Sequence, residues 1–523
     1  MNKYPFYQNE PVDSIVQIIE RSEKMYGDSV AIRFKKNKAI HDKSYLDLAT
    51  DSRKLAGFLL DKSYNKGHIA VFGSPSYEWI ITYFGTVFAG MVIVPLDVDL
   101  PADELYDLIV RADVECVFYD EQYADIVDTL KNYHLLKIQF LSLNIINSLS
   151  FKEISLPTVD PDRLSAILFT SGTTKKSKGV MLTQRNIASN VIQGLGAVDL
   201  QHGKDVLLSV LPLNHAYAFT GILMFLYRGA MVCISSGLKY IQKDFIDLQP
   251  TLMYVVPLIA EKLYEKVLLS VKKQNKEKAF SLALKICSFF KKINIDLTEK
   301  FFAEIKSAFG GKLKRILCGG APLNEDLIGK FGGIGINLIQ GYGLTECSPL
   351  LTANFDYYHR SNSVGKVVEG NCVKIVDGEI WAKGTSVSQG YYNDPETTAE
   401  SFEDGWFKTG DLGSVDKDNF LYVTGRKKNL IILSNGKNVS AEELENILYQ
   451  INCVTEVIVY GENDKIIAEI YSEDNQQDSL LEVLNAEKDK INRTLPAYKN
   501  IDKIILREAP FPKTTTKKIK RYK

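Results

Sequence analysis

Short apolar runs of strand length alternate with amphipathic helical segments over most of the chain, and this alternation restricts the fold more than any other feature. The runs include IAVFG from Ile69, MVIVPLD from Met91, SAILFTSG from Ser165 and TLMYVVP from Thr251. Helical periodicity is clear in VDSIVQIIERSEKMYG and in SYLDLATDSRKLAGFLLDKSY, each of which ends near turn-forming residues. Strands that alternate with helices predict an α/β core with largely parallel sheets.

The predicted secondary structure changes after Val373, from alternating strands and helices to β-hairpins. The segment VKIVDGEIWAKG carries an Asp377-Gly378 hairpin turn, and LGSVDKDNFLYVTGR reads as a second hairpin. Beyond Arg426 strands and helices alternate again, with a capping box from Ser440 to Glu443. A chain of 523 residues exceeds the size of a single core. We therefore predict a large N-terminal domain of α/β sheets (1–426) with a β-rich subdomain at about 360–426, and a small α+β C-terminal domain (427–523).

Charge and cysteine content exclude several classes of protein. Lys plus Arg total 63 against 64 Asp plus Glu, which argues against a protein that coats nucleic acid, so no nucleic-acid partner is expected. The seven cysteines are scattered without a C-x-x-C pair, so neither a disulfide framework nor a zinc site is supported. The N-terminus has no secretory signal pattern. We expect a cytoplasmic protein.

Two segments allow a membrane interpretation. The most apolar window, which begins at Ile69, is broken by Pro75, Glu78 and glycines, and this favours a buried strand-helix-strand unit over a membrane span. The stretch from Lys262 to Lys314 is rich in lysine and amphipathic. A solvated helical insertion is its plainest interpretation, and a peripheral contact with anionic lipid is the alternative.

A loop rich in hydroxyls and lysines follows the apolar run AILF. Its sequence from Thr170 to Val180 is TSGTTKKSKGV, and such a loop can wrap phosphate oxygens with hydroxyl and amide donors while Lys178 neutralises charge. Ser177 stands where the common phosphate-binding loop has its second glycine. The segment alone would also fit a polar surface loop.

Three further segments carry suitable chemistry. In QGYGLTE, at the end of a predicted strand, Tyr342 offers an aromatic face, Thr345 a hydroxyl and Glu346 an oxygen ligand for magnesium. Asp411 could accept hydrogen bonds from ribose hydroxyls, and Lys518 lies in a lysine-rich terminal segment. Taken singly, these residues also fit a glycine turn with a hydrogen-bonded glutamate, a turn carboxylate and a tail charge.

The order of these segments carries a resemblance. The chain has TSGTTKKSKG, LPLNHAYAF, GYGLTE, TGD, GRKKNLI and PKTTTKKIKR in sequence and at domain-scale spacing. It thereby resembles the adenylate-forming superfamily of AMP-binding enzymes over about Tyr45 to Arg521. The wording GRKKNLIILSNGKNVS and the helical insertion after Pro257 look most like the long-chain fatty acyl-CoA synthetases.

The resemblance implies a role for each matching residue. The phosphates of ATP would be held by the loop residues Thr170, Ser171, Gly172, Thr173, Thr174 and Lys178. The adenine would stack on Tyr342, with Gly319, Gly320, Ala321 and Pro322 on its other side. Thr345 would contact the α-phosphate, Glu346 the magnesium, and Asp411 and Arg426 the ribose. Lys518 would act in adenylation, Lys428 would be the hinge of a mobile small domain, and Gly436 would admit the CoA arm. His215 and Tyr217 would shape the acyl pocket, although a core histidine fits His215 equally.

The same resemblance implies an acid:thiol ligase that uses ATP, Mg²⁺ and CoA. An apolar acid, of medium or long chain, is favoured over an amino acid, because the residues after Tyr217 carry no aspartate to pair with an ammonium. One alternative acceptor is the phosphopantetheine of an acyl carrier protein. Lys175 and Lys517 replace glycines that are usual in the family, so a catalytically impaired nucleotide-binding protein is a further alternative.

Overall fold

The structure is a computed structural model that describes residues 3–62, 64–133, 138–150, 155–170, 177–434, 436–451, 453–473, 477–513 and 519–521. The chain forms two compact units. Unit 1 comprises Met1–Cys372 and Ala382–Phe407, and unit 2 comprises Val373–Trp381 and Lys408–Lys523. The domain boundary after residue 426 that the sequence suggests stays a prediction.

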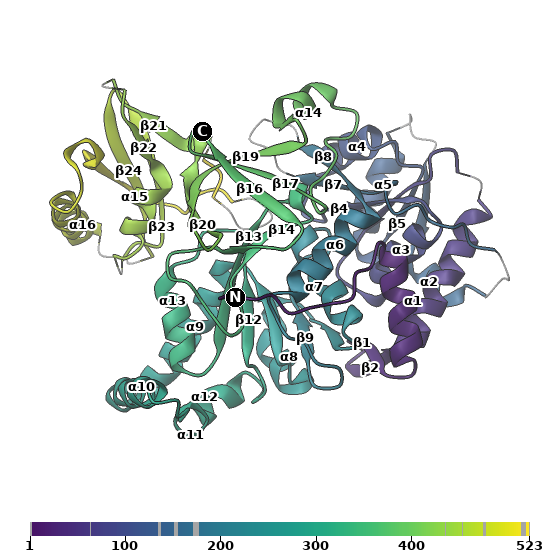
Figure 1. The fold of residues 1–523 in the computed structure, drawn as a ribbon, viewed down its shortest axis with the longest axis horizontal. Helices are drawn as coiled ribbons and strands as arrows, with labels where there is room; N and C mark the ends of the chain where they lie inside the picture. Colours follow the sequence, from purple (N-terminus) through teal and green to yellow (C-terminus); the bar gives the residue numbers. More distant parts are fainter. Residues whose placement is uncertain are drawn as a thin grey trace. The chain divides into compact units, whose positions relative to one another are not determined.

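One sheet of unit 1 has the strand order β6-β5-β3-β4-β7-β8 (Figure 1). Its neighbours are parallel except β7 and β8, which are antiparallel. The strands are β3 (His68–Phe72), β4 (Val92–Leu96), β5 (Cys116–Tyr119), β6 (Gln139–Ser142), β7 (Leu164–Thr170) and β8 (Lys178–Thr183). The apolar window at Ile69 forms β3, α3 (Tyr77–Phe88) and β4, so the predicted strand-helix-strand unit is confirmed.

The second sheet of unit 1 runs β2-β1-β10-β9-β11-β12-β13-β14-β15. The strands from β1 to β13 are parallel to their neighbours, and antiparallel strands flank them on both sides. The strands are β1 (Val30–Lys36), β2 (Ala39–Ser44), β9 (Val206–Ser209), β10 (Met231–Ile234), β11 (Leu252–Val255), β12 (Arg315–Cys318), β13 (Asn337–Gly343), β14 (Leu350–Ala353) and β15 (Gly365–Val367). The predicted α/β class is confirmed.

Buried helices from the two sheets meet inside unit 1. Every residue of α3 is buried, and α7 (Ala216–Tyr227) is buried along nearly its whole length. Tyr83 of α3 stacks on Phe219 of α7 with ring centroids 3.8 Å apart. The other helices of the first half are α1 (Ile15–Tyr26), α2 (Tyr45–Leu60), α4 (Ala102–Arg111), α5 (Ala124–Lys131), α6 (Gln184–Leu195) and α8 (Ile241–Leu248). Helices as apolar as α3 and α7 are stable only in such a buried position.

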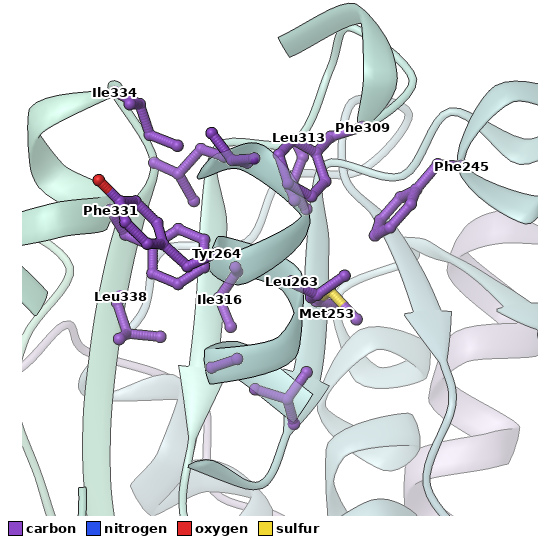
Figure 2. Packing of buried hydrophobic residues seen from close by; sticks show 14 of the residues in the cluster. Phe245, Met253, Leu263, Tyr264, Phe309, Leu313, Ile316, Phe331, Ile334 and Leu338 are labelled. Atoms are coloured by element: carbon purple, nitrogen blue, oxygen red, sulfur yellow. The ribbon is translucent and has the colours of Figure 1, made fainter. Parts of the chain in front are cut away.

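An apolar cluster beneath β11, β12 and β13 anchors the helices that follow them (Figure 2). Phe245, Met253, Ile316, Phe331 and Leu338 belong to it. The helices are α9 (Pro257–Lys273), α10 (Glu277–Lys291), α11 (Thr298–Phe301), α12 (Ala303–Ala308) and α13 (Glu325–Gly333). The Lys-rich segment is therefore a helical insertion whose inner side is part of the core.

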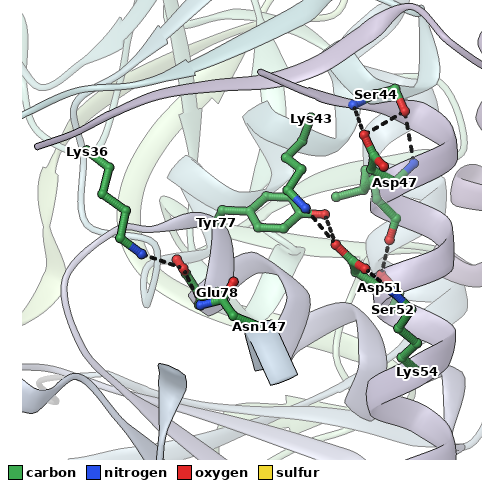
Figure 3. Close-up of polar contacts among 11 residues, drawn as sticks. Lys36, Lys43, Ser44, Asp47, Asp51, Ser52, Lys54, Tyr77, Glu78 and Asn147 are labelled. Atoms are coloured by element: carbon green, nitrogen blue, oxygen red, sulfur yellow. Dashed lines mark hydrogen bonds and ion pairs between the residues drawn. The ribbon is translucent and has the colours of Figure 1, made fainter. Parts of the chain in front are cut away.

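Polar contacts tie α2 to α3 at one edge of unit 1 (Figure 3). The Tyr77 hydroxyl donates to Asp51 at 2.9 Å, and the ammonium groups of Lys43 and Lys54 each lie 3.0 Å from the same carboxylate. Glu78 accepts from Asn147 at 3.1 Å. Because Tyr77 is buried, its hydroxyl needs this partner, and the carboxylate supplies it.

Unit 2 is mainly antiparallel. The predicted hairpin turn is confirmed, since Asp377 and Gly378 have φ of 49° and 80° between β16 (Asn371–Val376) and β17 (Glu379–Gly384). β19 (Trp406–Val415) and β20 (Phe420–Arg426) form the second predicted hairpin. The remaining elements are α14 (Pro395–Ser401) and β18 (Phe402–Glu403), both in unit 1, and β21 (Leu430–Ile432), β22 (Asn438–Ser440), α15 (Ala441–Leu448), β23 (Glu456–Glu462), β24 (Lys465–Tyr471), α16 (Gln477–Asn492) and β25 (Lys503–Arg507) in unit 2.

Half of the predicted capping box at α15 forms. The Ser440 hydroxyl accepts the Glu443 N–H at 3.3 Å, as expected for an N-cap. The Glu443 carboxylate instead pairs with Lys499 at 2.7 Å, because an ammonium group is a stronger partner than the Ser440 amide. None of the helices in the described part of the chain is both long and apolar enough to cross a membrane.

Candidate active site

The two ends of the predicted phosphate loop are held in register. β7 ends at Thr170, β8 begins at Lys178, and these two residues pair across the hairpin. Ser177 accepts a hydrogen bond from the Arg111 guanidinium at 2.7 Å through its carbonyl. The predicted loop residues between them, Ser171, Gly172, Thr173, Thr174 and Lys175, lie outside the described residues.

Tyr391 connects the exit of this loop to the predicted magnesium ligand. Its hydroxyl donates to Oε1 of Glu346 at 2.9 Å, and the Lys178 ammonium lies 5.0 Å from the centre of its ring. Glu346 is also fixed through its backbone, because its carbonyl accepts the Ser388 N–H at 2.7 Å. The structure thus brings two predicted residues, Lys178 and Glu346, to the same aromatic side chain.

The backbone around Tyr391 runs beside β8. The Met181 N–H donates to the Gly390 carbonyl at 3.0 Å, and the Tyr392 N–H donates to the Gly179 carbonyl at 2.8 Å. Burial, together with the neighbouring Glu346 carboxylate, raises the pKa of Tyr391, so its phenol stays a proton donor. Sequence reasoning missed this residue, since no local pattern separates it from Tyr392.

We expect Tyr391→Phe to weaken cation binding at Glu346. The change removes the hydrogen bond that orients the Glu346 carboxylate, but it leaves the aromatic ring that Lys178 contacts. Loss of a hydrogen bond to a metal ligand typically lowers metal affinity by about tenfold. The Mg²⁺ dependence of acid-stimulated ATP/pyrophosphate exchange measures it. Tyr392→Phe is the control, because the Tyr392 hydroxyl donates to Asp113 at 2.8 Å instead. Equal Mg²⁺ dependence in both variants would contradict the role of Tyr391.

Two neighbouring parallel strands deliver the predicted base-binding residues. Cys318 at the end of β12 pairs with Gln340 in β13, so Gly319 and Tyr342 follow at the same edge of the sheet. A Cβ built on Gly319 would lie 3.2 Å from the Gly341 carbonyl. Gly320, Ala321 and Pro322 continue from this point as an irregular segment. Ligands bind at such carboxyl edges in open α/β sheets.

The turn that carries Thr345 and Glu346 is tightly closed. The Leu344 N–H donates to the Pro349 carbonyl at 2.9 Å, and a Cβ on Gly343 would lie only 1.8 Å from that oxygen. Asn190 of α6, which is fully buried, donates to the Leu350 carbonyl at 2.7 Å and accepts the Leu350 N–H at 3.0 Å. These contacts fix the position from which the Glu346 side chain extends.

An apolar cavity lies between the helices α6 and α7 and the second sheet. It is narrow, with a volume of about 40 Å³. Its lining includes Tyr217, Met224, Tyr254, Ile339 and Leu350, and among the described residues that line it none is charged. The predicted pocket residue Tyr217 therefore lines a cavity, packed edge-on against Tyr254 at 5.3 Å between ring centroids.

His215 lies outside this lining. It is the N-cap residue of α7 and is half-buried, and the cavity begins with Tyr217 two residues later. Because successive helical residues near an N-terminus point to different sides, the two residues need not share a pocket. The assignment of His215 to the acyl pocket stays a prediction.

In unit 2 the structure brings together Asp411 and Arg426. They are direct partners in the β19–β20 register, and Nε of Arg426 lies 2.6 Å from Oδ1 of Asp411. Asp411 is 3% exposed, whereas the Arg426 side chain is 39% exposed. A buried carboxylate oriented by a half-exposed guanidinium offers two polar groups on one surface of the unit.

The other predicted residues of unit 2 lie in loops. Lys428 follows β20 in a single 3₁₀ turn, Lys427–Asn429. Gly436 has φ of 75°, and a Cβ built there would meet nothing within 4 Å. Glycine at this position is thus required by backbone conformation rather than by a close neighbour. Lys517 and Lys518 lie outside the described residues.

Comparison with known families settles what kind of protein carries this geometry. The model of a family described as AMP-binding enzyme matches residues 19–392. The chain belongs to the AMP-binding enzyme family. A second model, described as the AMP-binding enzyme C-terminal domain, matches residues 428–523 of this AMP-binding enzyme. The family that the ordered motifs indicate is therefore confirmed.

Several relatives of this AMP-binding enzyme are named as fatty acyl-CoA ligases or synthetases. Fatty acyl-CoA synthetase B of Dictyostelium discoideum is 31% identical over 76% of this chain and 67% of its own length. The long-chain-fatty-acid–CoA ligase FadD15 of Mycobacterium bovis is 29% identical over 78% of this chain and 73% of its own. Their likeness confirms that the chain is most similar to the long-chain branch.

Solved structures of the same fold cover nearly the whole chain. A fatty acyl-CoA synthetase of Mycobacterium tuberculosis matches with a TM-score of 0.70, 22% identity and 97% of each chain. The o-succinylbenzoate CoA synthetase MenE of Bacillus subtilis, in complex with ATP and magnesium ion, matches with a TM-score of 0.77, 21% identity, 96% of this chain and 98% of its own. This AMP-binding enzyme therefore has their fold, with large and small domains.

Proposed function

We propose that the protein is an AMP-forming acid–CoA ligase that activates an apolar carboxylic acid, of medium or long chain, with ATP and Mg²⁺. In the first step a carboxylate oxygen attacks the α-phosphorus of ATP, and pyrophosphate leaves with the electrons of the broken phosphoanhydride bond. In the second step the sulfur of CoA attacks the acyl carbon, and AMP leaves. Both half-reactions are those that the similarity to acyl-CoA synthetases implies.

The uncharged cavity, whose lining includes Gly341, is the observation that carries the choice of substrate. Its lining is mostly aromatic and aliphatic and, among the described residues, gives an ammonium or a second carboxylate of the substrate no charged partner, and burying a charge without an ion-pair partner is costly. An alkyl chain, in contrast, gains free energy with each methylene that leaves water. The cavity therefore favours a hydrocarbon tail over an amino acid.

Glu346 fits a magnesium ion. One of its oxygens accepts from Tyr391, and in the described part of the chain Oε2 has no hydrogen-bond or ion-pair partner. Mg²⁺ is commonly bound by one or two protein carboxylates together with the phosphates of a nucleotide, and a carboxylate oxygen that is held in place but otherwise unpartnered suits this role. Bound there, the ion would neutralise phosphate charge during attack on the α-phosphorus.

The remaining roles in this proposal follow the family resemblance. Thr170, Lys178 and the loop between them hold the phosphates, Thr345 contacts the α-phosphate, and Tyr342 stacks on adenine opposite Gly319 to Pro322. Asp411 and Arg426 bind the ribose hydroxyls, and Lys518 approaches the reacting carboxylate. Rotation about Lys428 separates the two half-reactions, and Gly436 lies beside the pantetheine arm. A carboxylate needs no general base, so the residues mainly align and neutralise.

A series of straight-chain acids in the ATP/pyrophosphate exchange assay tests the substrate class. We expect kcat/KM to rise about fourfold for each methylene that enters the cavity, from about 0.8 kcal/mol per buried methylene, and to level off when the cavity is full. Met224→Glu, which places a charge in the lining, should abolish this rise while butyrate activity changes little. Faster exchange with an amino acid than with any fatty acid would refute the apolar assignment.

Acceptor competition tests the second half-reaction. We propose CoA as the acceptor, and incubation of preformed acyl-AMP with equal amounts of CoA and a carrier protein bearing phosphopantetheine should yield acyl-CoA. Predominant acylation of the carrier would establish the alternative instead. No acid-dependent exchange at all, despite bound ATP, would favour the impaired nucleotide-binding protein. A cytoplasmic location belongs to the same proposal.

A further inference from the structure

The insertion between β11 and β12 concentrates positive charge in a chain that is close to neutral. The whole protein has a formal net charge of -1. Between Leu268 and Ile295, however, seven lysines stand against one acidic residue, Glu277, which gives this short stretch a net charge of +6. The stretch comprises the end of α9 and all of α10, which Figure 1 draws at the margin of unit 1. Such a local field attracts anionic surfaces.

One side of α10 is anchored in the core. Ala283 and Cys287 are buried members of the apolar cluster that includes Phe331, and Phe280 packs edge-on against Phe302 with ring centroids 5.6 Å apart. These residues recur at the three- and four-residue spacing of one helix face. The orientation of the helix about its own axis is therefore fixed, and its opposite face points away from the cluster.

The opposite face alternates lysines with large apolar side chains. Lys278, Leu282, Lys285 and Phe289 follow one another at spacings of four, three and four residues, so they form one row along the helix. Leu282 is 59% exposed and Phe289 is 65% exposed. Ile293, 56% exposed, continues the row beyond the helix end. We call these five residues the α10 row.

Neither lysine of the α10 row is neutralised within the protein. In the described ranges neither Lys278 nor Lys285 has an ion pair, whereas Lys276 nearby pairs with Glu304 at 2.9 Å. Leu282 and Phe289 are each more than half exposed to water. Both kinds of side chain are thus available to a partner that is anionic at its surface and apolar beneath it.

We propose that the α10 row is a peripheral binding surface for anionic membrane lipid. Lysine ammonium groups meet the lipid phosphates, and Leu282, Phe289 and Ile293 enter the boundary between headgroups and acyl chains, as amphipathic helices do at membranes. A nucleic acid would use the charge but not the aliphatic side chains. An acidic protein would have to supply a matching apolar groove, and the exposed row stands convex to solvent.

Co-sedimentation of the full chain with two kinds of vesicle tests this proposal. One kind is pure phosphatidylcholine, and the other is an equal mixture of phosphatidylcholine and phosphatidylglycerol. We expect strong binding only to the mixed vesicles. The double variant Lys278→Gln/Lys285→Gln should bind them roughly 25-fold more weakly, because each lysine near an anionic surface contributes about fivefold. Leu282→Ser/Phe289→Ser should bind roughly tenfold more weakly.

Matched variants exclude a general effect of charge. Lys465→Gln/Lys503→Gln removes two exposed lysines from unit 2, and its binding should equal that of the unaltered protein. ATP/pyrophosphate exchange with a short, water-soluble acid should be the same in all variants, because the α10 row contributes nothing to the proposed active site. If the unaltered protein showed no exchange activity, the proposed ligase function would be refuted, whereas the proposed lipid-binding surface would not.

Two results would overturn the proposal. The first is an absence of binding to the mixed vesicles, whatever other acidic macromolecule the row then binds. The second is vesicle binding that is equally strong in the two α10 double variants and in the unit 2 control.

Discussion

Lys518→Ala is expected to slow formation of the acyl-adenylate by about 10²- to 10³-fold, the usual cost of removing one group that stabilises developing charge. Thioester formation from preformed acyl-AMP should change little, because the attack on the α-phosphorus, during which the lysine neutralises charge, is already complete. Single-turnover measurement of each half-reaction separates the two. Lys520→Ala removes a neighbouring exposed lysine and serves as the control.

The surroundings of Lys518 make this variant interpretable. On one side the Lys513 ammonium lies 2.5 Å from the buried Glu456 carboxylate, whose other oxygen accepts the Phe511 N–H at 2.7 Å. On the other side Arg521 pairs with the buried Glu445. Both flanks are therefore attached to unit 2 independently of residue 518. Equal loss of both half-reactions would contradict the role that we propose for Lys518.

Gly343→Ala is expected to destabilise unit 1 by roughly 3 kcal/mol or more. The added methyl would lie 1.8 Å from the Pro349 carbonyl oxygen, and because that atom belongs to the backbone, the clash is relieved only by opening the turn that carries Glu346. Denaturant unfolding followed by tryptophan fluorescence gives the free energy. Activity should fall together with stability.

Gly332→Ala is the matched control for Gly343→Ala. Gly332 lies in α13, and a Cβ built on it meets nothing within 4 Å. Alanine should stabilise that helix by about 0.5–1 kcal/mol, since it restricts the unfolded chain and favours the helical backbone. If the two variants had the same stability, the close approach at Gly343 would not be the cause of its requirement for glycine.

Local pattern was enough to predict most of the secondary structure. Apolar runs bounded by turn residues predict β3, β4, β7 and β11, and the Asp377-Gly378 pair predicts its hairpin, because these signals act over a few neighbouring residues. Periodicity also predicts a helical insertion after Pro257, but not which of its faces is anchored. That depends on Phe302 and the strands beneath it.

Contacts between distant segments limited what could be predicted of the site. Tyr391 meets Glu346 only because residues 390–392 run beside β8, a pairing that no local motif encodes. From the sequence Gly343 resembles an ordinary turn glycine, and only the structure shows that the Pro349 carbonyl leaves no room for a side chain there. The ion pair of Asp411 and Arg426 depends on a register with a bulge between Leu412 and Gly413. Resemblance named both residues but not their contact.

The pairing of Thr170 with Lys178 has a consequence for engineering. Because β7 and β8 are paired along their length, we expect that the residues between them can be exchanged without altering these two strands. Restoring glycine at position 175 would then report on nucleotide handling alone. Loops from relatives could be placed between the same two strands, and the affinity for nucleotide could then be varied through the loop sequence.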